Sequence, residues 1–300
     1  MNDRDQCYIE MKGFRFLDVL GCGACGVVYK IYDPAYDREF ALKSVLESKF
    51  NKNEIQSMQD VDDNNVIRLY GYDYYQGSVY LLMEYCPCSL EKFLKYRNSI
   101  SNLLLIKYSM GILKSIRACH HANVAHLDIK PANFLIDQYD RIRVTDFGLS
   151  AKHLLNELDI QYAGSVPFMA PEILSKLPHD SLKADIWAIG VTFFIMATGK
   201  LPWIGNDRNT VCHNLMMMPP RIDLIENKEY AEIVNKCLQK DPEMRPTIDE
   251  MFEYPIFHEE SIAIIKKPVH NTFIVNSRRT CSRSQISFIC QPRLQKMKLH

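Results

Sequence analysis

The sequence lacks the features that mark membrane and secreted proteins. Its longest apolar run, residues 186–199, falls short of the ~18 residues that a membrane span needs, and it contains two glycines. The N-terminal segment MNDRDQCYIEMKG has acidic groups and no apolar stretch, so it is unlike a signal peptide. We therefore expect residues 186–199 to form a buried core helix. We expect the protein to lie in the cytoplasm or the nucleus, without membrane contact.

The cysteine pattern indicates neither a metal site nor disulfide bonds. None of the ten cysteines belongs to a pair of CxxC motifs; Cys22 and Cys25 lie inside a glycine-rich stretch, and Cys86 and Cys88 flank a proline. This usage is typical of reduced thiols in a cytosolic or nuclear protein. Internal repeats and low-complexity tracts are absent as well.

Acidic residues are missing from one end of the chain. Residues 261–300 hold eight Lys or Arg and no Asp or Glu, although the whole chain has 36 residues of each sign. The remaining 28 basic and 36 acidic groups make residues 1–260 net negative. We expect the basic tail, residues 258–300, to contact this acidic body or to bind an acidic partner, the alternative being a flexible tail. We expect no nucleic-acid partner.

The order of the predicted elements is strands first and helices afterwards. Strand-like segments separated by turn residues occur at 14–21, 26–33, 39–45, 66–75 and 78–85. A helix is predicted at 53–61, and after Pro87 the apolar residues recur at helical spacing. We therefore predict a small, mostly antiparallel sheet followed by a helical region, joined near Cys86.

A glycine-rich stretch, GCGACG, lies between the first two predicted strands. Glycines in a strand–turn–strand let backbone amides approach nucleotide phosphates without an obstructing side chain. A dinucleotide-binding site of the GxGxxG type is disfavoured, because that site requires a helix after the glycines and Val27, Val28 and Ile31 favour a strand.

A second group of residues has the chemistry of phosphoryl transfer. In HLDIKPAN, Asp128 can orient and deprotonate a substrate hydroxyl, Lys130 can neutralise the transferred phosphoryl group, and Asn133 can bind Mg²⁺. Asp146, in Asp-Phe-Gly, supplies a second metal ligand. Lys43, in FALK, is either a solvated strand lysine or a phosphate-binding one.

Taken in order, these motifs resemble those of eukaryotic serine/threonine protein kinases over residues 14–257. The resemblance extends to Ala-Pro-Glu at 170–172, to DIWAIG at 185–190, and to Arg245, which in the family pairs with Glu172. It implies an α+β, bilobal protein kinase fold. A small β-rich N-lobe with the αC helix is expected at 14–85 and a larger, mainly helical C-lobe at 86–257. Residues 1–13 would be an N-terminal extension, and the protein a monomer.

The resemblance also assigns the catalytic and nucleotide-binding residues. Lys43 is expected to pair with Glu54 of the αC helix and to hold the phosphates of ATP, although the link between the two is shorter than in most kinases. Met83 falls at the gatekeeper position. Residues expected against ATP are Leu20, Gly21, Cys22, Gly23, Ala24, Cys25, Gly26, Val28, Ala41, Lys43, Met83, Glu84, Cys86 and Leu135. Residues expected in the regulatory spine are Met58, Leu69, His126 and Phe147.

Three positions bear on specificity. Lys130 is typical of serine/threonine kinases, and Ser165 takes the place of a threonine whose hydroxyl bridges Asp128 and Lys130. Dual specificity is the alternative. Ala132 argues against a preference for basic substrates. The motif HLDIKPAN also resembles the corresponding motif of Mos-like kinases.

One position departs from the usual pattern. Leu127 replaces the arginine that normally receives an activation-segment phosphate, and residues 151–164 contain no Ser or Thr, only Tyr162. We therefore expect an active enzyme that needs no phosphate there. Two alternatives are a pseudokinase scaffold and a small-molecule kinase. The first is disfavoured because Lys43, Asp128 and Asp146 are all present, the second by the motifs at 170–172 and 185–190.

Overall fold

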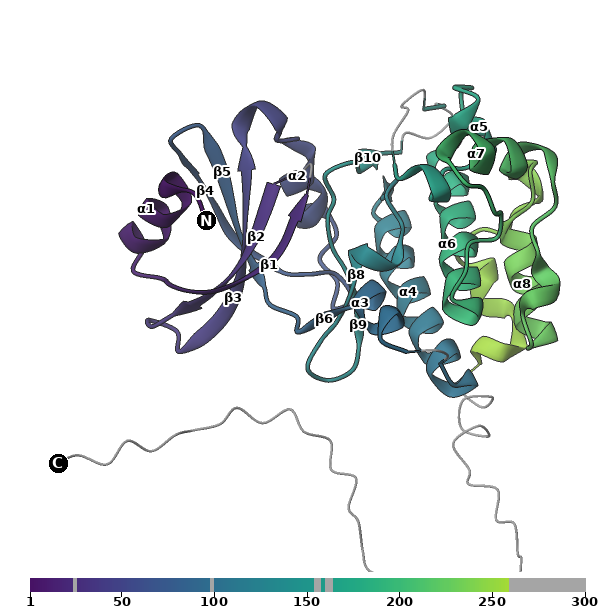
Figure 1. Cartoon of the computed structure of the whole chain (residues 1–300), viewed down its shortest axis with the longest axis horizontal. Helices are drawn as coiled ribbons and strands as arrows, with labels where there is room; N and C mark the ends of the chain where they lie inside the picture. The colour runs from purple at the N-terminus through teal and green to yellow at the C-terminus, as the bar shows by residue number, and fades with distance from the viewer. Residues whose placement is uncertain (24–25, 98–99, 154–157, 160–163, 259–300) are drawn as a thin grey trace, which may run out of the picture. The chain divides into compact units, whose positions relative to one another are not determined.

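The computed structural model describes residues 1–23, 26–97, 100–153, 158–159 and 164–258. Within this part of the chain, a strand-rich lobe precedes a helical one, as predicted (Figure 1). Ala24, Cys25, Tyr162 and the tail from residue 259 lie outside the described residues, so the predictions made for them stay predictions.

The N-lobe is built on one five-stranded antiparallel sheet of order β1-β2-β3-β5-β4. The strands are β1 (Arg15–Gly23), β2 (Gly26–Asp33), β3 (Arg38–Leu46), β4 (Leu69–Tyr75) and β5 (Ser78–Glu84). Residues 40–45 of the central strand β3 are almost all buried, because both faces of the sheet are covered. Side chains alternate between the two faces along each strand, so Lys43 and Ser44 lie on opposite faces.

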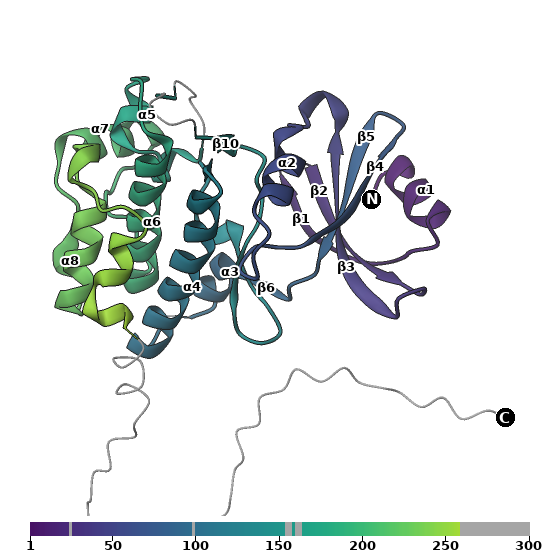
Figure 2. The ribbon, with the colours of Figure 1, turned by 180° about the vertical axis from the view of Figure 1, so that it is seen from behind.

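Two helices cover the two faces of this sheet. Helix α2 (Asn53–Asp60), at the position of the αC helix, shares one apolar core with Ala41, Leu81 and Met83. Helix α1 (Asp3–Met11) packs on the other face. Figures 1 and 2 show the sheet between the two helices. The segment predicted to be an extension is therefore folded onto the N-lobe.

The strand predicted at 66–75 is shorter in the structure. It begins at Leu69, and the preceding Val66 instead forms a parallel bridge with Val144 of the C-lobe. The Ile67 amide also donates a hydrogen bond to the Val144 carbonyl (2.9 Å). Both Val66 and Ile67 are buried, so this exchange lets two apolar residues join the core between the lobes.

The C-lobe packs its helices around a long apolar one. Its helices are α3 (Leu90–Lys95), α4 (Asn102–His121), α5 (Pro171–Leu174), α6 (Ser181–Thr198), α7 (Arg208–Met217) and α8 (Lys228–Cys237). Its short strands are β6 (Cys88–Ser89), β7 (Val124–Ala125), β8 (Phe134–Ile136), β9 (Ile142–Val144) and β10 (Ala151–Lys152). Helix α6 is long and apolar enough to span a membrane by length and composition, but 72% of it is buried in this fold. The prediction of a buried core helix is confirmed.

Candidate active site

Lys43 lies at the centre of a buried charge cluster between the two lobes. Its Nζ is 2.6 Å from Glu54 Oε1 of α2 and 2.7 Å from Asp146 Oδ1 of the C-lobe. Burial opposes the charge on Lys43, but these two carboxylates outweigh it and raise the pKa of the lysine. Burial likewise opposes the charge on Asp146, yet Lys43 lowers the pKa of that carboxyl. Both groups are therefore charged at neutral pH, and the short link to Glu54 does not prevent the pair.

The segment after Asp146 holds α2 in place through three further contacts. Asn51, two residues before α2, donates a hydrogen bond to the Gly148 carbonyl (3.1 Å). The Ser150 hydroxyl donates one to the Ser57 hydroxyl (2.8 Å), and both side chains are buried. Lys152 forms an ion pair with Asp60 (2.8 Å). Sequence reasoning missed these contacts, since their partners lie about 90 residues apart and no motif links them.

The predicted spine residues are packed together across the lobes. Phe147 is fully buried, and its ring centre is 5.0 Å from that of His126. Met58 is buried and Leu69 packs against the same core. Asp146 adopts a left-handed backbone (φ 66°), which is uncommon for a residue other than glycine and is often found at functional sites.

The catalytic loop gathers the residues predicted for phosphoryl transfer. Lys130 Nζ donates hydrogen bonds to Asp128 Oδ2 (2.6 Å) and to Ser165 Oγ (2.8 Å). The Ser165 hydroxyl donates to Asp128 Oδ1 (3.0 Å), so the serine bridges the two as predicted. Asn133 Nδ2 donates to the Asp128 carbonyl oxygen (2.8 Å) and to Oδ2 (3.0 Å). The carboxylate at the centre is thus fixed by three side chains.

The carboxylate of Asp185, in α6, holds the backbone of this loop through hydrogen bonds. This carboxylate is 1% exposed and accepts hydrogen bonds from the amides of His126 (2.8 Å) and Leu127 (2.9 Å). His120 Nε2 of α4 lies 3.0 Å from the same carboxylate. The acidic residue of DIWAIG therefore belongs to the machinery that positions Asp128.

The described residues predicted to contact the nucleotide lie on strands of the N-lobe sheet, just after β5 and on β8. Ala41 and Met83 are register partners on β3 and β5, and both are buried. Val28 and Leu135 are half-buried. Cys86, at the joint between the lobes, is 7% exposed, and burial raises the pKa of its thiol to about 12. The described residues of β1 predicted to cover ATP, Leu20 to Gly23, are exposed.

Gly26 shows why the glycine-rich stretch needs glycine at its end. Its backbone has a positive φ of 130°, and an added Cβ would lie 2.1 Å from the Ser44 carbonyl oxygen. Any side chain at this position would push β2 away from β3.

The metal-binding donors fit Mg²⁺ held together with a phosphate ligand. Among the described residues, no group of three or more His, Cys, Asp and Glu could form a metal site by itself. Asp146 and Asn133 supply one carboxylate and one amide oxygen. Mg²⁺ in such sites usually takes its other ligands from phosphates and water. This donor set therefore suits a Mg²⁺–ATP complex.

The ion pair predicted between Arg245 and Glu172 is also present. Arg245 is buried, and its two terminal nitrogens lie 2.6 Å and 2.8 Å from the two carboxylate oxygens of Glu172. The guanidinium lies over the Trp187 ring, 5.1 Å from its centre. This bidentate pair ties Ala-Pro-Glu to the helical core.

Comparisons with known proteins agree with this geometry. Residues 14–257 match the family described as "Protein kinase domain". The dual specificity mitogen-activated protein kinase kinase mek-1 of Caenorhabditis elegans is 28% identical over 264 residues, which cover 84% of this chain and 76% of that protein.

For two further relatives, the match covers a smaller share of the relative's own length. Aurora kinase of Dictyostelium discoideum is 27% identical over 250 residues, 79% of this chain and 64% of that protein. Sperm motility kinase 3A of mouse is 25% identical over 250 residues, 82% of this chain and half of that protein. This chain therefore spans only part of these two relatives. With the fold and the motif residues in place, the chain belongs to the protein kinase family.

Proposed function

We propose that the protein is an active serine/threonine kinase that transfers the γ-phosphate of ATP to protein hydroxyls in intracellular signalling. The observation that carries the proposal is the simultaneous presence of two assembled clusters. Lys43, Glu54 and Asp146 form a continuous ion-pair cluster, and Asp128 is hydrogen-bonded to Lys130 and Asn133. A nucleotide-free scaffold would not need both.

The residues have distinct roles in the proposed transfer. Asp128 accepts the proton of the substrate hydroxyl and orients the oxygen of that hydroxyl toward the γ-phosphate. Lys130, beside Asp128, stabilises the negative charge of the phosphoryl group during transfer. Lys43 holds the α- and β-phosphates while Glu54 keeps its ammonium in position. Mg²⁺, held by Asp146 and Asn133, would neutralise phosphate charge.

Serine/threonine specificity is supported by the bridge through Ser165. The hydroxyl of Ser165 connects Asp128 and Lys130. The segment around Ser165, called here the substrate loop, and the catalytic base Asp128 are therefore held in one arrangement. Among the relatives, mek-1 is named a dual specificity kinase and ULK3 of Xenopus laevis, 28% identical over 263 residues, a serine/threonine-protein kinase.

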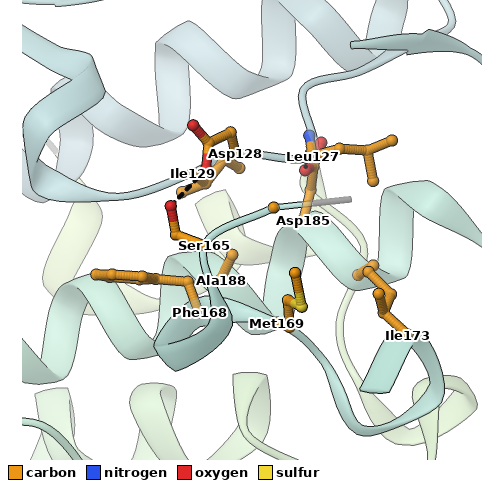
Figure 3. A pocket seen from close by; sticks show the side chains of 11 residues that line it. Leu127, Asp128, Ile129, Ser165, Phe168, Met169, Ile173, Asp185 and Ala188 are labelled. Atoms are coloured by element: carbon orange, nitrogen blue, oxygen red, sulfur yellow. Dashed lines mark hydrogen bonds between the residues drawn. The ribbon is translucent and has the colours of Figure 1, made fainter. Parts of the chain in front are cut away.

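We further propose that activity does not depend on a phosphate in the activation segment. Leu127 is buried and lines a pocket of about 10 Å³, close to the lower limit for one water molecule (Figure 3). Met169 and Ile173 line the same pocket, together with the carboxylates of Asp128 and Asp185. Its described lining has no basic side chain that could receive a phosphate.

The backbone around Leu127 packs directly against the segment that contains Gly164. Leu127 has a positive φ of 61°, and its amide is held by Asp185. An added Cβ at Gly164 would lie 2.8 Å from the Leu127 carbonyl, so the two segments are in close contact. Together with the Ser57–Ser150 and Asp60–Lys152 contacts, this packing supports an active arrangement that needs no added charge.

The test is phosphate transfer by protein made in bacteria and treated with phosphatase. We expect incorporation of labelled phosphate into casein or myelin basic protein. We expect Lys43→Met and Asp146→Asn to lower the rate by ~10²–10³ or more while the protein stays folded. Activity that collapses after phosphatase and returns with a phosphate in residues 149–165 would refute the second proposal. Wild-type protein that neither binds Mg²⁺–ATP nor transfers phosphate would favour the pseudokinase.

A further inference from the structure

The N-terminal helix carries a buried carboxylate that the proposed reaction does not use. Asp5 is 1% exposed, and three hydroxyl groups of the sheet donate hydrogen bonds to it. These come from Tyr29 of β2 (2.6 Å), Tyr80 of β5 (2.6 Å) and Ser44 of β3 (2.9 Å). Asn2, the N-cap of α1, donates a fourth (3.0 Å). A buried carboxylate is costly unless it is bonded in this way, so α1 and the sheet fit each other closely.

The charge states of this cluster are well defined. Burial alone would raise the pKa of Asp5, but the hydrogen bonds from Tyr29, Tyr80 and Ser44 outweigh it, and the pKa is lowered. Burial and the bond to Asp5 raise the pKa of Tyr80 to about 12. At neutral pH the carboxylate is therefore ionised and the tyrosine remains a hydrogen-bond donor.

Aromatic and apolar contacts hold the rest of the helix on the sheet. The Tyr8 ring stacks on the Tyr80 ring, with centres 3.7 Å apart and an interplanar angle of 9°. Ile9 is buried in the same cluster, against Ile31 and Leu42. Burying large aromatic rings contributes substantially to packing. The helix therefore covers a sheet face that would otherwise expose several apolar side chains.

The residues that hold Asp5 are direct neighbours of the nucleotide-binding groups. Ser44 follows Lys43 in β3, and Tyr29 follows Val28 in β2, each pair pointing to opposite faces of the sheet. The Ser44 carbonyl is also the group against which Gly26 packs. One residue, Ser44, thus contacts α1 with its side chain and the end of the glycine-rich turn with its backbone.

We propose that Asp5 is a positioning residue, which acts through Ser44 and Tyr29 to hold Lys43 and the glycine-rich turn at the spacing that binds ATP. The ATP readout of this proposal rests on the proposed kinase function. Its effect on the backbone of β2 and β3 does not, because the hydrogen bonds to Asp5 join only protein groups.

The experiment compares the full chain with Asp5→Ala, Asp5→Asn and Ser44→Ala. Asp3→Asn is the matched control, because Asp3 is an exposed carboxylate in the same first turn of α1. Affinity for a fluorescent ATP analogue with Mg²⁺ is measured well below the unfolding temperature of every variant. Hydrogen exchange of residues 26–33 and 38–46 is followed without nucleotide.

We expect Asp5→Ala to raise the Kd for the analogue by roughly 3- to 10-fold and to speed exchange in both segments. Asp5→Asn, which keeps one acceptor oxygen, should lie between wild type and alanine, and the control should match wild type. If Asp5→Ala does not fold, Asp5→Asn and Ser44→Ala still decide the question.

Two outcomes separate this proposal from the proposed function. Variants that unfold at lower temperature but keep wild-type affinity and exchange would overturn the positioning role and leave only a stabilising one. If wild type binds no analogue, the proposed function fails. Faster exchange in Asp5→Ala would then still support the positioning role, and unchanged exchange would overturn it.

Discussion

Replacing Ser165 by alanine would remove the hydroxyl that joins Asp128, the proposed catalytic base, to Lys130. The alanine variant loses the hydrogen bond from Lys130 (2.8 Å) and the one to Asp128 (3.0 Å). A hydrogen bond to a charged group contributes about 1.5–3 kcal/mol. Asp128 keeps its bonds from Lys130 and Asn133, so we take the lower part of that range, ~1.5–2 kcal/mol. A loss of this size in the transition state lowers kcat roughly 10- to 30-fold.

The assay is steady-state phosphate transfer at saturating ATP, with Ser165→Thr as the matched variant. Threonine keeps the hydroxyl, so it should keep most of the activity. Because Ser165 lies in the substrate loop, the KM for ATP should change little. Its half-buried position predicts a small change in unfolding temperature. Equal activity of the alanine variant and wild type would refute the bridging role, as would a threonine variant that is as slow as the alanine variant.

Three further predictions concern stability and the tail. Arg245→Ala should lower the free energy of unfolding in urea by about 3–5 kcal/mol, because Glu172 is left buried without its partner; a loss below about 1 kcal/mol would contradict this. Deleting residues 261–300 should change the kinetics at low salt more than at high salt, since opposite net charges attract only where salt does not screen them; identical kinetics of both proteins at both salt concentrations would argue against any contact. Because the folded pKa of Asp5 is lowered, its ionisation stabilises the fold above the ordinary value of 3.8, and this contribution is lost as pH falls through the folded pKa. The difference in unfolding free energy between wild type and Asp5→Asn should therefore shrink below about pH 4, and a difference independent of pH would count against the lowered pKa.

Much of the N-lobe could be predicted because its information is local. The strand EFALKSV shows apolar and polar residues in the order that a central strand needs, and β3 forms there. Lys43 and Glu54 could be paired because only 11 residues separate them and both belong to recognisable motifs. Similarly, Asp128, Lys130 and Asn133 lie within a single loop, so their spacing alone brings them together.

Other features depend on partners that are distant in the sequence. The helix DRDQCYIEM buries only Asp5, Tyr8 and Ile9, and its stripe is too short to reveal a docking face. The hydroxyls that hold Asp5 come from positions 24, 39 and 75 residues away. The neighbours of Val66 in the sequence favour a strand of the sheet. The true partner of Val66, Val144, lies in the other lobe.

The buried thiol at the joint between the lobes has a consequence for redox chemistry. Oxidants and alkylating reagents react with thiolates, and burial raises the pKa of the Cys86 thiol, so this side chain stays protonated at neutral pH. Cys22, at the end of β1, is instead open to solvent. Oxidative stress would therefore modify the rim of the glycine-rich turn while the joint stays reduced. Once the other accessible thiols, the exposed Cys7 among them, are replaced, a reporter group attached to Cys22 could follow that turn without labelling Cys86.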